Sequence, residues 1–387
     1  MSFRAGQFVT QSTGYRAFVP NPLPPYPEVA LTPDLLSLLG EADRALGRLD
    51  GLAENLPNPD LFVSMYIRKE AVLSSQIEGT QASLVDILQL EAEAPQQELP
   101  GDVSEVYRYV RAMNFGLQRL NELPLSLRLI REIHRELLTG ARGGAKTPGE
   151  FRRTQNWIGP PGSTLQEAAF VPPAPHEMKI ALGDVERFIH SSGLAPALLK
   201  CALVHCQFET IHPFLDGNGR VGRLLITFML CAEGILTRPL LYLSLFLKQR
   251  RAEYYARLTA VREKGDWEGW VQFFLLGVRD VSRQSAQLAR TILHLQRKHR
   301  AMVESRVPGS MAGVRLLDLL FKHPVLTAAQ AGRALAVSAP TAYNLIGQFQ
   351  KLRLLDELTG KRRNRFFSYR PYLNLFEQIE KKPVSRG

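Results

Sequence analysis

Cysteine is scarce in this sequence, with three in 387 residues, at Cys201, Cys206 and Cys231. None belongs to a Cys-x-x-Cys pair, and all three lie in apolar stretches with helical spacing. This usage does not suggest a disulfide framework. It indicates buried free thiols in a reducing compartment.

Long uninterrupted apolar segments are also missing. The N-terminal residues 1–7, Met-Ser-Phe-Arg-Ala-Gly-Gln, have no apolar core of the kind found in a signal peptide. The most apolar run, 224–247, contains Glu233, Arg238 and Pro239, so it predicts core helices rather than a membrane span. We expect a cytoplasmic protein that does not contact a membrane.

Alternating strand patterns are absent from the first third of the chain. Residues 20–27 are proline-rich and must be extended, after which Thr32 and Pro33 resemble the cap and first residue of a helix. A turn-rich stretch at 147–173 predicts a loop or short hairpin between helices. Apolar residues at helical spacing predict helices over 59–78, 83–95, 102–121 and about 273–300. The pattern predicts a mainly α fold.

Positive charge is concentrated near the C-terminus. The chain has a formal net charge of +11, and residues 301–387 hold 14 Lys and Arg against 6 Asp and Glu. Three helical stretches there precede two short strands around the basic turn 361–365. This order is typical of a winged helix-turn-helix domain. A basic domain favours a nucleic-acid partner, but such domains also bind proteins, and both alternatives stay open.

The segment 212–223 carries the strongest chemical signal. Pro213 ends the preceding helix at His212, and glycines on both sides of Asn218 prevent regular structure, so the backbone N–H groups of this turn form a concave anion site. A new helix follows at once and directs its positive end toward the same loop. The loop therefore predicts binding of an anionic ligand.

Charged residues in this segment narrow the ligand to a polyphosphate. Arg220 and Arg223 lie in the first turn of the new helix, where positive charge is unfavourable unless an anion binds. Asp216 offers hard oxygen ligands to a Mg²⁺ ion that bridges phosphates. His212, just before the loop, is placed to act as a base on an incoming hydroxyl group.

A zinc site is the main chemical alternative. His205 and His212 are seven residues apart, and Cys201, Cys206 and Asp216 are near them in the sequence. Zinc-binding helices usually place their ligands four residues apart, and Pro213 interrupts the geometry. We therefore regard zinc as the minor alternative.

The run His-Pro-Phe-Leu-Asp-Gly-Asn-Gly-Arg-Val-Gly-Arg at 212–223 resembles the Fic family signature at every fixed position. The resemblance implies a helical core that uses ATP and Mg²⁺ to transfer AMP to a Ser, Thr or Tyr hydroxyl of a target protein or of itself. It also implies that 147–173 is the flap that holds the target by main-chain pairing. Transfer of UMP or phosphocholine is an alternative within the family.

By position, the resemblance makes His212 the general base and Asp216 the Mg²⁺ ligand. Tyr255 follows the core at a place where the family lines the nucleotide pocket. Further nucleotide contacts fall on Glu78, His212, Gly217, Asn218, Gly219, Arg220, Val221, Gly222 and Arg223.

A second motif lies at Ser74-Ser-Gln-Ile-Glu78-Gly79. The helix before it is expected to end at Gly79, which leaves the Glu78 carboxylate at a helix C-terminus, where it is disfavoured by about 0.3–1 kcal/mol. A cationic partner would offset this cost. The segment is similar to the inhibitory motif of many Fic proteins, which implies that Ser74, Glu78 and Gly79 form a restraint in which Glu78 pairs with Arg223.

These features predict three regions. They are a helical N-terminal region at 1–120, a catalytic core with a connector helix at 121–300, and a winged helix-turn-helix domain at 301–387. Two alternatives to AMP transfer remain: removal of AMP by the same site, and a DNA-binding regulator that senses a nucleotide. The resemblance also implies pairing of two copies as a homodimer.

Overall fold

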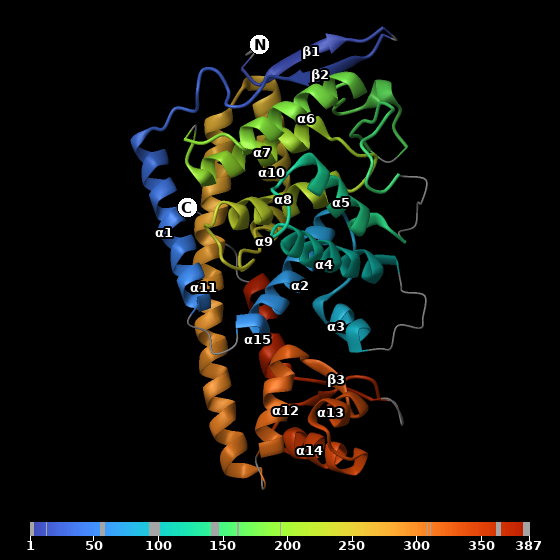
Figure 1. The fold of residues 1–387 in the computed structure, drawn as a ribbon, viewed down its shortest axis with the longest axis vertical. Helices are drawn as coiled ribbons and strands as arrows, with labels where there is room; N and C mark the ends of the chain where they lie inside the picture. The colour runs from blue at the N-terminus through green and yellow to red at the C-terminus, as the bar shows by residue number, and fades with distance from the viewer. Residues whose placement is uncertain are drawn as a thin grey trace.

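The computed structural model describes residues 4–12, 14–54, 59–92, 101–140, 147–160, 162–193, 195–307, 309, 311–360 and 365–381. Helices dominate, as predicted (Figure 1). The α-helices are α1 (Pro33–Glu54), α2 (Pro59–Ile77), α3 (Leu84–Ala92), α4 (Gly101–Arg119), α5 (Leu127–Leu138), α6 (Pro175–Ile189), α7 (Ala197–Ile211), α8 (Asn218–Ala232), α9 (Ser244–Gln249), α10 (Arg251–Lys264), α11 (Trp267–Arg306), α12 (Met311–Lys322), α13 (Ala328–Leu335), α14 (Ala339–Lys351) and α15 (Arg370–Lys381). The strands are β1 (Gly6–Thr10), β2 (Arg16–Pro20), β3 (Val325–Thr327), β4 (Asp356–Glu357) and β5 (Phe366–Ser368).

Helix α11 connects the two ends of the molecule. It has 40 residues, which corresponds to about 60 Å, and runs from the catalytic region to the C-terminal helices (Figure 1). It is longer than the predicted 273–300. Helix α1 packs along it, starting at Pro33 with the Thr32 hydroxyl accepting from the Leu35 N–H at 3.3 Å, which confirms the predicted cap.

The prediction of a strand-free first third was wrong. Strands β1 and β2 form an antiparallel hairpin in which Gly6 pairs with Pro20 and Thr10 with Arg16. Each strand has five residues, and β1 is only half-buried, so neither gives a long alternating pattern. The hairpin is held by a distant segment, because Phe170 packs on Phe18 with 6.1 Å between ring centroids.

The turn-rich stretch forms less β-structure than a hairpin. Ile158 and Phe170 make one isolated antiparallel bridge, and a 3-10 helix, η2 (Leu165–Glu167), lies between them. Prolines at 160, 172 and 173 have no N–H to donate to a ladder. The β-pairing of this stretch is therefore limited to the single bridge between Ile158 and Phe170.

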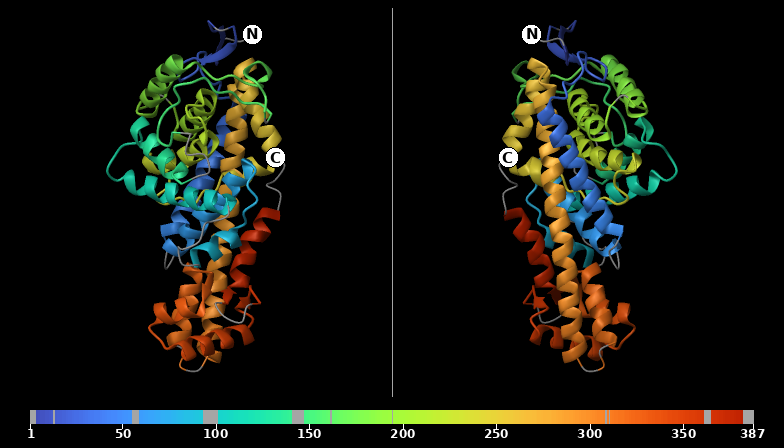
Figure 2. Two further views of the ribbon diagram at one scale, coloured as in Figure 1. Left: turned by 90° about the vertical axis from the view of Figure 1, so that its right-hand side faces the viewer. Right: turned by 90° about the vertical axis from the view of Figure 1, so that its left-hand side faces the viewer.

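The C-terminal unit, which we define as residues 311–368, consists of α12, α13 and α14 with the antiparallel strand order β3-β5-β4. Thr327 and Gln330 form a capping box at α13, and Ser338 caps α14. The helices and the final strand pair follow the predicted order, whereas β3 was not predicted. Residues 361–364 of the expected wing lie outside the described residues. Figure 2 shows the unit at one end of the molecule.

Helix α15 was not predicted, and it leaves the C-terminal unit. It runs back toward α2 and α11 in the middle of the molecule (Figure 1). The Phe376 ring meets Tyr66 of α2 edge-on, with 6.1 Å between centroids. The end of the described chain therefore packs against the helix whose last turn carries Ser74 and leads into Glu78 and Gly79. Among the described helices, none has the length and apolarity needed to cross a bilayer.

Candidate active site

The strongest sequence motif lies where α7 ends and α8 begins. His212 has φ 49° and ψ 60°, in the left-handed region, and its N–H donates to the Phe208 carbonyl at 3.0 Å. A non-glycine residue there costs about 1–3 kcal/mol and needs support from its surroundings. The structure supplies that support through the His212 carbonyl, which accepts from the Arg152 Nε at 3.0 Å and the Asn156 Nδ2 at 3.2 Å.

Arg152 is the main brace of this turn. Its side chain is buried, with 1% of the residue exposed, and it also donates to the carbonyl of Pro173 at 2.5 Å. Its own N–H donates to the Pro213 carbonyl at 2.9 Å. Because every acceptor is a backbone carbonyl, Arg152 fixes the path of the chain around His212.

The loop after His212 is closed by its own asparagine. The Asn218 Oδ1 accepts from the Phe214 N–H and its Nδ2 donates to the Phe214 carbonyl, both at 2.8 Å. Gly217 has φ 79° and begins α8, and its N–H donates to the Asp216 Oδ1 at 2.6 Å. The loop is thereby held with the N-terminus of α8 facing it, as an anion cradle requires.

His134 of α5 braces the same loop from outside. Its Nδ1 accepts from the Gly149 N–H at 2.8 Å, so the Nε2 carries the proton and donates to the Asp216 carbonyl at 3.0 Å. Its ring stacks on Phe214, with centroids 3.7 Å apart. Burial lowers the pKa of His134 to about 4, so the ring stays neutral and keeps this tautomer.

The two arginines of α8 have different partners. Arg220 donates to the Glu105 Oε2 at 3.0 Å, and its Nη2 lies 3.5 Å from the Asp216 Oδ1. Arg223, whose side chain is 1% exposed, turns toward α2. Of the two guanidinium groups at the start of α8, that of Arg220 thus lies beside the loop and that of Arg223 contacts the end of α2.

Glu78 reaches Arg223 across 145 residues of sequence. Helix α2 ends at Ile77, and Gly79 has φ 106°. The Arg223 Nη2 donates to the Glu78 Oε1 at 2.5 Å, and Arg223 also donates to the Ser74 hydroxyl at 2.8 Å and the Ser74 carbonyl at 3.1 Å. Ser74 and Glu78 therefore hold one guanidinium together.

The Glu78 carboxylate also covers the start of α8. A Cβ atom built on Gly219 would overlap the Glu78 Oε1. Since the N–H groups of this turn are where an anion would bind, the carboxylate lies against the anion cradle itself. Gly219 is thus the position that allows this approach.

Burial and charge set the protonation states. Burial alone would raise the pKa of Glu78, but Arg223, Arg220 and His212 lower it below its usual range, so Glu78 is an anion at neutral pH. Burial lowers the pKa of His212 to about 4, with Arg152 acting in the same direction and the Glu209 carbonyl against it. His212 is therefore neutral and able to accept a proton.

Glu209, in the last turn of α7, packs against the helix α8 that carries Arg220 and Arg223. Its side chain is buried, a Cβ on Gly222 would overlap its Oε1, and that oxygen has no hydrogen-bond partner in the structure. Burial raises its pKa to about 7, partly offset by Arg223. The role of Gly222 is thus to make room for this carboxyl group, while Val221 faces the core with 2% exposed.

Tyr255 of α10 lies at the edge of this region and is 40% exposed. Its ring lies 5.1 Å from that of Tyr254 and has the Arg251 guanidinium over it at 5.6 Å. Burial raises its pKa, and the nearby Glu78 acts in the same direction. The ring is therefore close to the Glu78–Arg223 pair.

The zinc alternative gains no geometric support. The His205 Nδ1 contacts the Gly222 carbonyl and its Nε2 contacts the Tyr254 hydroxyl, both at 2.9 Å. The Cys201 thiol donates to the Ile226 carbonyl. Within the described part of the chain, no cluster of three His, Cys, Asp or Glu side chains is arranged to hold a metal ion.

Two family models match this chain. One is the Fic/DOC family N-terminal region, over residues 36–118, and the other is the Fic/DOC family itself, over residues 124–230. Residues 36–118 and 124–230 thus belong to the Fic/DOC family. The second match contains the whole segment from His134 to Arg223, and the first contains Ser74 and Glu78.

Curated relatives match slightly less than half of the chain. Protein adenylyltransferase Fic of Drosophila virilis is 32% identical over 184 residues, which cover 45% of this chain and 33% of that protein. The Drosophila melanogaster protein of the same name is 30% identical, with the same coverage. The alignment thus spans about a third of the length of these relatives.

Solved structures confirm the fold. A Fic family protein from Desulfovibrio desulfuricans superposes with a TM-score of 0.56 at 20% identity, covering 87% of this chain and 96% of the other. A Fic domain signalling protein from Bacteroides thetaiotaomicron gives 0.51 at 18% identity, covering 65% and 97%. The predicted mainly α Fic fold is confirmed by this likeness.

The structure brings together the residues that the sequence singled out in two distant motifs. It adds residues that sequence reasoning missed, namely His134, Arg152, Asn156, Glu105 and Glu209. Glu209 lies on a helix already predicted, so its only signal was a charged residue in an apolar stretch. The others act on backbone carbonyls or on Arg220 from elsewhere in the chain, and no local pattern marks them.

Proposed function

We propose that this protein transfers AMP from ATP to a hydroxyl of a target protein or of itself, and that Glu78 restrains the reaction through Arg223. The observation that carries the proposal is a neutral histidine beside an anion-binding helix terminus that an internal carboxylate covers. The curated relatives bear the name protein adenylyltransferase, which supports the same reaction.

In this reaction the hydroxyl oxygen attacks the α-phosphorus of ATP. The bond from that phosphorus to the oxygen bridging toward the β-phosphate breaks, and pyrophosphate leaves. His212 accepts the hydroxyl proton, and a polyphosphate bound beside it raises its basicity. The N–H groups at the start of α8, with Arg220, are placed to hold the phosphates.

Asp216 fits the role of Mg²⁺ ligand by its chemistry. Its carboxylate lies at the mouth of the loop, and the side chain is 35% exposed. A hard divalent cation prefers such oxygen ligands, and it would neutralise phosphate charge when bound. Its Oδ1 is already oriented by the Gly217 N–H at 2.6 Å.

The restraint follows from competition for one guanidinium. Arg223 is buried and donates to Glu78 and Ser74, so a γ-phosphate would have to displace the Glu78 carboxylate. Both ligands are anionic and need the same donor. Release of Glu78 is therefore expected to expose the productive nucleotide position.

Glu78→Gly tests the restraint. We expect this variant to label itself with labelled ATP and Mg²⁺ at least about 5-fold faster than wild type, within the range of ordinary coupling between sites. Adding His212→Ala is expected to remove about 10²–10⁴-fold of that rate. Equal labelling by wild type and Glu78→Gly would contradict the restraint, while labelling that survives His212→Ala would contradict the assigned base.

Removal of AMP by the same site is a second candidate. Glu78 is close enough to His212 to influence its pKa, and its side chain is 37% exposed, so it has room to orient a water molecule. A modified protein carrying labelled AMP discriminates the two directions. Loss of label that requires Glu78 would favour removal, and gain of label that Glu78 suppresses would favour transfer.

Binding of DNA by the C-terminal unit is a further proposal, as is pairing of two copies of the chain. For DNA binding, the support is an exposed face of α14 that includes Thr341, Tyr343 and Asn344. The Arg365 guanidinium lies 5.9 Å from the Tyr343 ring centroid. A winged helix would present this face to a DNA groove. Binding of duplex DNA that weakens steeply as salt rises would support the first proposal.

A further inference from the structure

Glu380 of α15 is held by two lysines that lie far from it in the sequence. Its Oε2 accepts from the Lys69 Nζ at 2.6 Å, and its Oε1 accepts from the Lys248 Nζ at 2.7 Å. Lys69 belongs to α2 and Lys248 to α9. One carboxylate thus joins the final described helix to α2 of the N-terminal region and α9 of the catalytic core.

Lys248 extends this contact to the segment that carries Glu78. Its Nζ also donates to the Gln76 Oε1 at 2.6 Å. Gln76 is two residues before Glu78, and its Nε2 donates to the Ala82 carbonyl at 3.0 Å. The last turn of α2 is therefore tied to α15 through a single lysine.

Lys69 shows how strongly this cluster depends on Glu380. Its side chain is 4% exposed, and a buried ammonium needs an anionic partner. Burial lowers the pKa of Lys69, and Glu380 acts against that effect. Burial alone would raise the pKa of Glu380, but Lys69 and Lys248 lower it. Loss of the carboxylate would leave a buried charge unpaired and loosen α2 around it.

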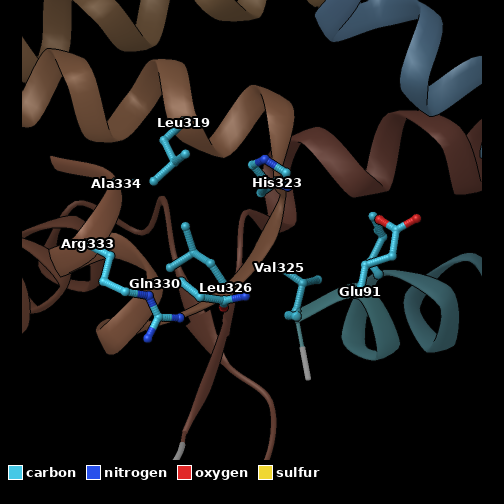
Figure 3. Close-up of a pocket in the computed structure, with 10 residues that line it drawn as sticks. Glu91, Leu319, His323, Val325, Leu326, Gln330, Arg333 and Ala334 are labelled. Atoms are coloured by element: carbon cyan, nitrogen blue, oxygen red, sulfur yellow. The ribbon is translucent and has the colours of Figure 1, made fainter. Parts of the chain in front are cut away.

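The C-terminal unit also contacts the N-terminal region directly, through β3 against α3 and α12 against α2. A cavity of about 400 Å³ lies beside the first of these contacts. Figure 3 shows Glu91 of α3 on one side, and Leu319, Leu326 and Arg333 of the C-terminal unit on the other. Incompletely filled contacts resist displacement less than close-packed ones. The α15 contact has a cavity too, of about 320 Å³ and lined by Lys69, Gln76 and Glu380. What distinguishes it is the set of ionic bonds that Glu380 makes there.

We propose that Glu380 couples the C-terminal unit to Glu78, so that displacement of α15 weakens the Glu78–Arg223 pair and releases the enzyme. This inference rests on the proposed function for its effect on activity, but the coupling itself is a property of the fold. A partner that binds the C-terminal unit and moves α15 would then act as an activator. The geometry requires no contact between that partner and the active site.

Hydrogen exchange of the full-length chain tests the coupling without any activity. The amides of Glu78, Gly79 and Thr80 donate to carbonyls of Ser75 and Gln76, so their exchange reports on the last turn of α2. We expect Glu380→Gln to speed exchange in peptides covering 74–80 by at least about 5-fold, with α7 unchanged. Lys248→Gln breaks the link from the other side and is expected to do the same.

Glu304→Gln is the control, because Glu304 is an exposed residue of α11 that pairs with Arg300 at 3.1 Å. It is expected to leave exchange at 74–80 as in wild type. Unchanged exchange in Glu380→Gln and Lys248→Gln, or an equal rise in Glu304→Gln, would overturn the coupling. Thermal unfolding of each variant verifies that it is folded.

Self-labelling then separates the coupling from the proposed restraint. We expect Glu380→Gln to label at least about 5-fold faster than wild type, and to add nothing in a Glu78→Gly background. Faster exchange at 74–80 without faster labelling, while Glu78→Gly labels faster, would overturn the regulatory inference alone. If Glu78→Gly labels no faster, the restraint fails, and with it the regulatory meaning of the contact.

Discussion

The loop at 212–223 and the segment at 74–79 meet in the active site but are built in different ways. The loop closes on itself, because Asn218 bonds the backbone of Phe214 four residues away. The 74–79 segment acts across the fold, because Glu78 binds Arg223, which lies 145 residues away, and lies against Gly219. Local hydrogen bonds close the loop, with Arg152 and His134 bracing it, whereas the packing of α2 against α8 makes the contact of Glu78.

This difference predicts how each motif fails. A change inside the loop removes the cradle whatever the rest of the chain does. A change near Glu78 leaves the cradle intact and alters only how often it is covered. Substitutions in the loop are therefore expected to lower activity, and substitutions in the 74–79 segment to raise it.

The largest expected effect is that of Asn218→Ala. The buried Phe214 N–H loses its partner, which costs about 1–3 kcal/mol, while the Phe214 carbonyl keeps its bond from the Asn156 Nδ2 at 2.9 Å. We expect at least about a 100-fold loss of labelling in a Glu78→Gly background and a fall of about 1–3 kcal/mol in the free energy of unfolding. Asn344→Ala, at an exposed position on α14, is expected to change both by little. A fully active Asn218→Ala would contradict the self-closing loop.

The fold was largely predictable because its helices carry local periodicity. The helices predicted over 59–78, 83–95 and 102–121 lie within a few residues of α2, α3 and α4. The β1–β2 hairpin was not predictable in this way, since Phe170 helps to bury it. Helix α15 carries local periodicity, with Tyr372, Leu373 and Phe376 buried at helical spacing, but it lies beyond the second strand, where the predicted winged helix-turn-helix pattern ends.

The site was predictable only where its residues are contiguous. The twelve-residue motif places His212 and the anion cradle together because the turn is local. His134 binds the backbone carbonyl of Asp216, and the Arg152 side chain binds those of Ile211 and His212. A backbone carbonyl leaves no side-chain signal in the sequence. Such supports are set by the tertiary path of the chain, which one sequence does not display.

Glu209 lies next to Gly222 of the loop and interacts with both Arg223 and Glu78. Substituting it is expected to give the next largest effect, on the free energy of unfolding. Its folded pKa of about 7 lies above the usual value of 4.5, so the folded state binds the proton more tightly than the unfolded state. The resulting stability is present below about pH 4.5 and is lost as pH rises through 7. Glu209→Gln is expected to remove this loss and gain up to about 3 kcal/mol over wild type between pH 5 and 8. Denaturant unfolding at pH 5 and pH 8 measures the free energy of unfolding of both proteins. If it changes by the same amount between the two pH values in wild type and variant, the raised pKa of Glu209 is refuted.

Ser74→Ala is expected to act on the restraint with a moderate effect. It removes one of the three bonds that hold Arg223, and a hydrogen bond to a charged group contributes about 1.5–3 kcal/mol. Because Glu78 remains, we expect labelling to rise about 10-fold or less, and no further than in Glu78→Gly. Ser75→Ala is the matched control, since Ser75 is equally buried and its hydroxyl has no hydrogen-bond partner. Equal effects of the two substitutions would show that packing, and not the bond to Arg223, holds the segment.

Tyr255 gives the smallest expected effect because it touches neither motif directly. Its ring is held between Tyr254 and Arg251, and its exposed part is available to stack on a nucleotide base. Such a ring contact contributes about 0.5–1.5 kcal/mol, so Tyr255→Ala is expected to raise the KM for ATP about 3-fold at unchanged kcat in a Glu78→Gly background. Tyr255→Phe keeps the ring and is expected to keep the KM. A fall in kcat with unchanged KM would show that Tyr255 acts on the reacting groups and does not stack on the nucleotide base. The site would then extend beyond the two motifs.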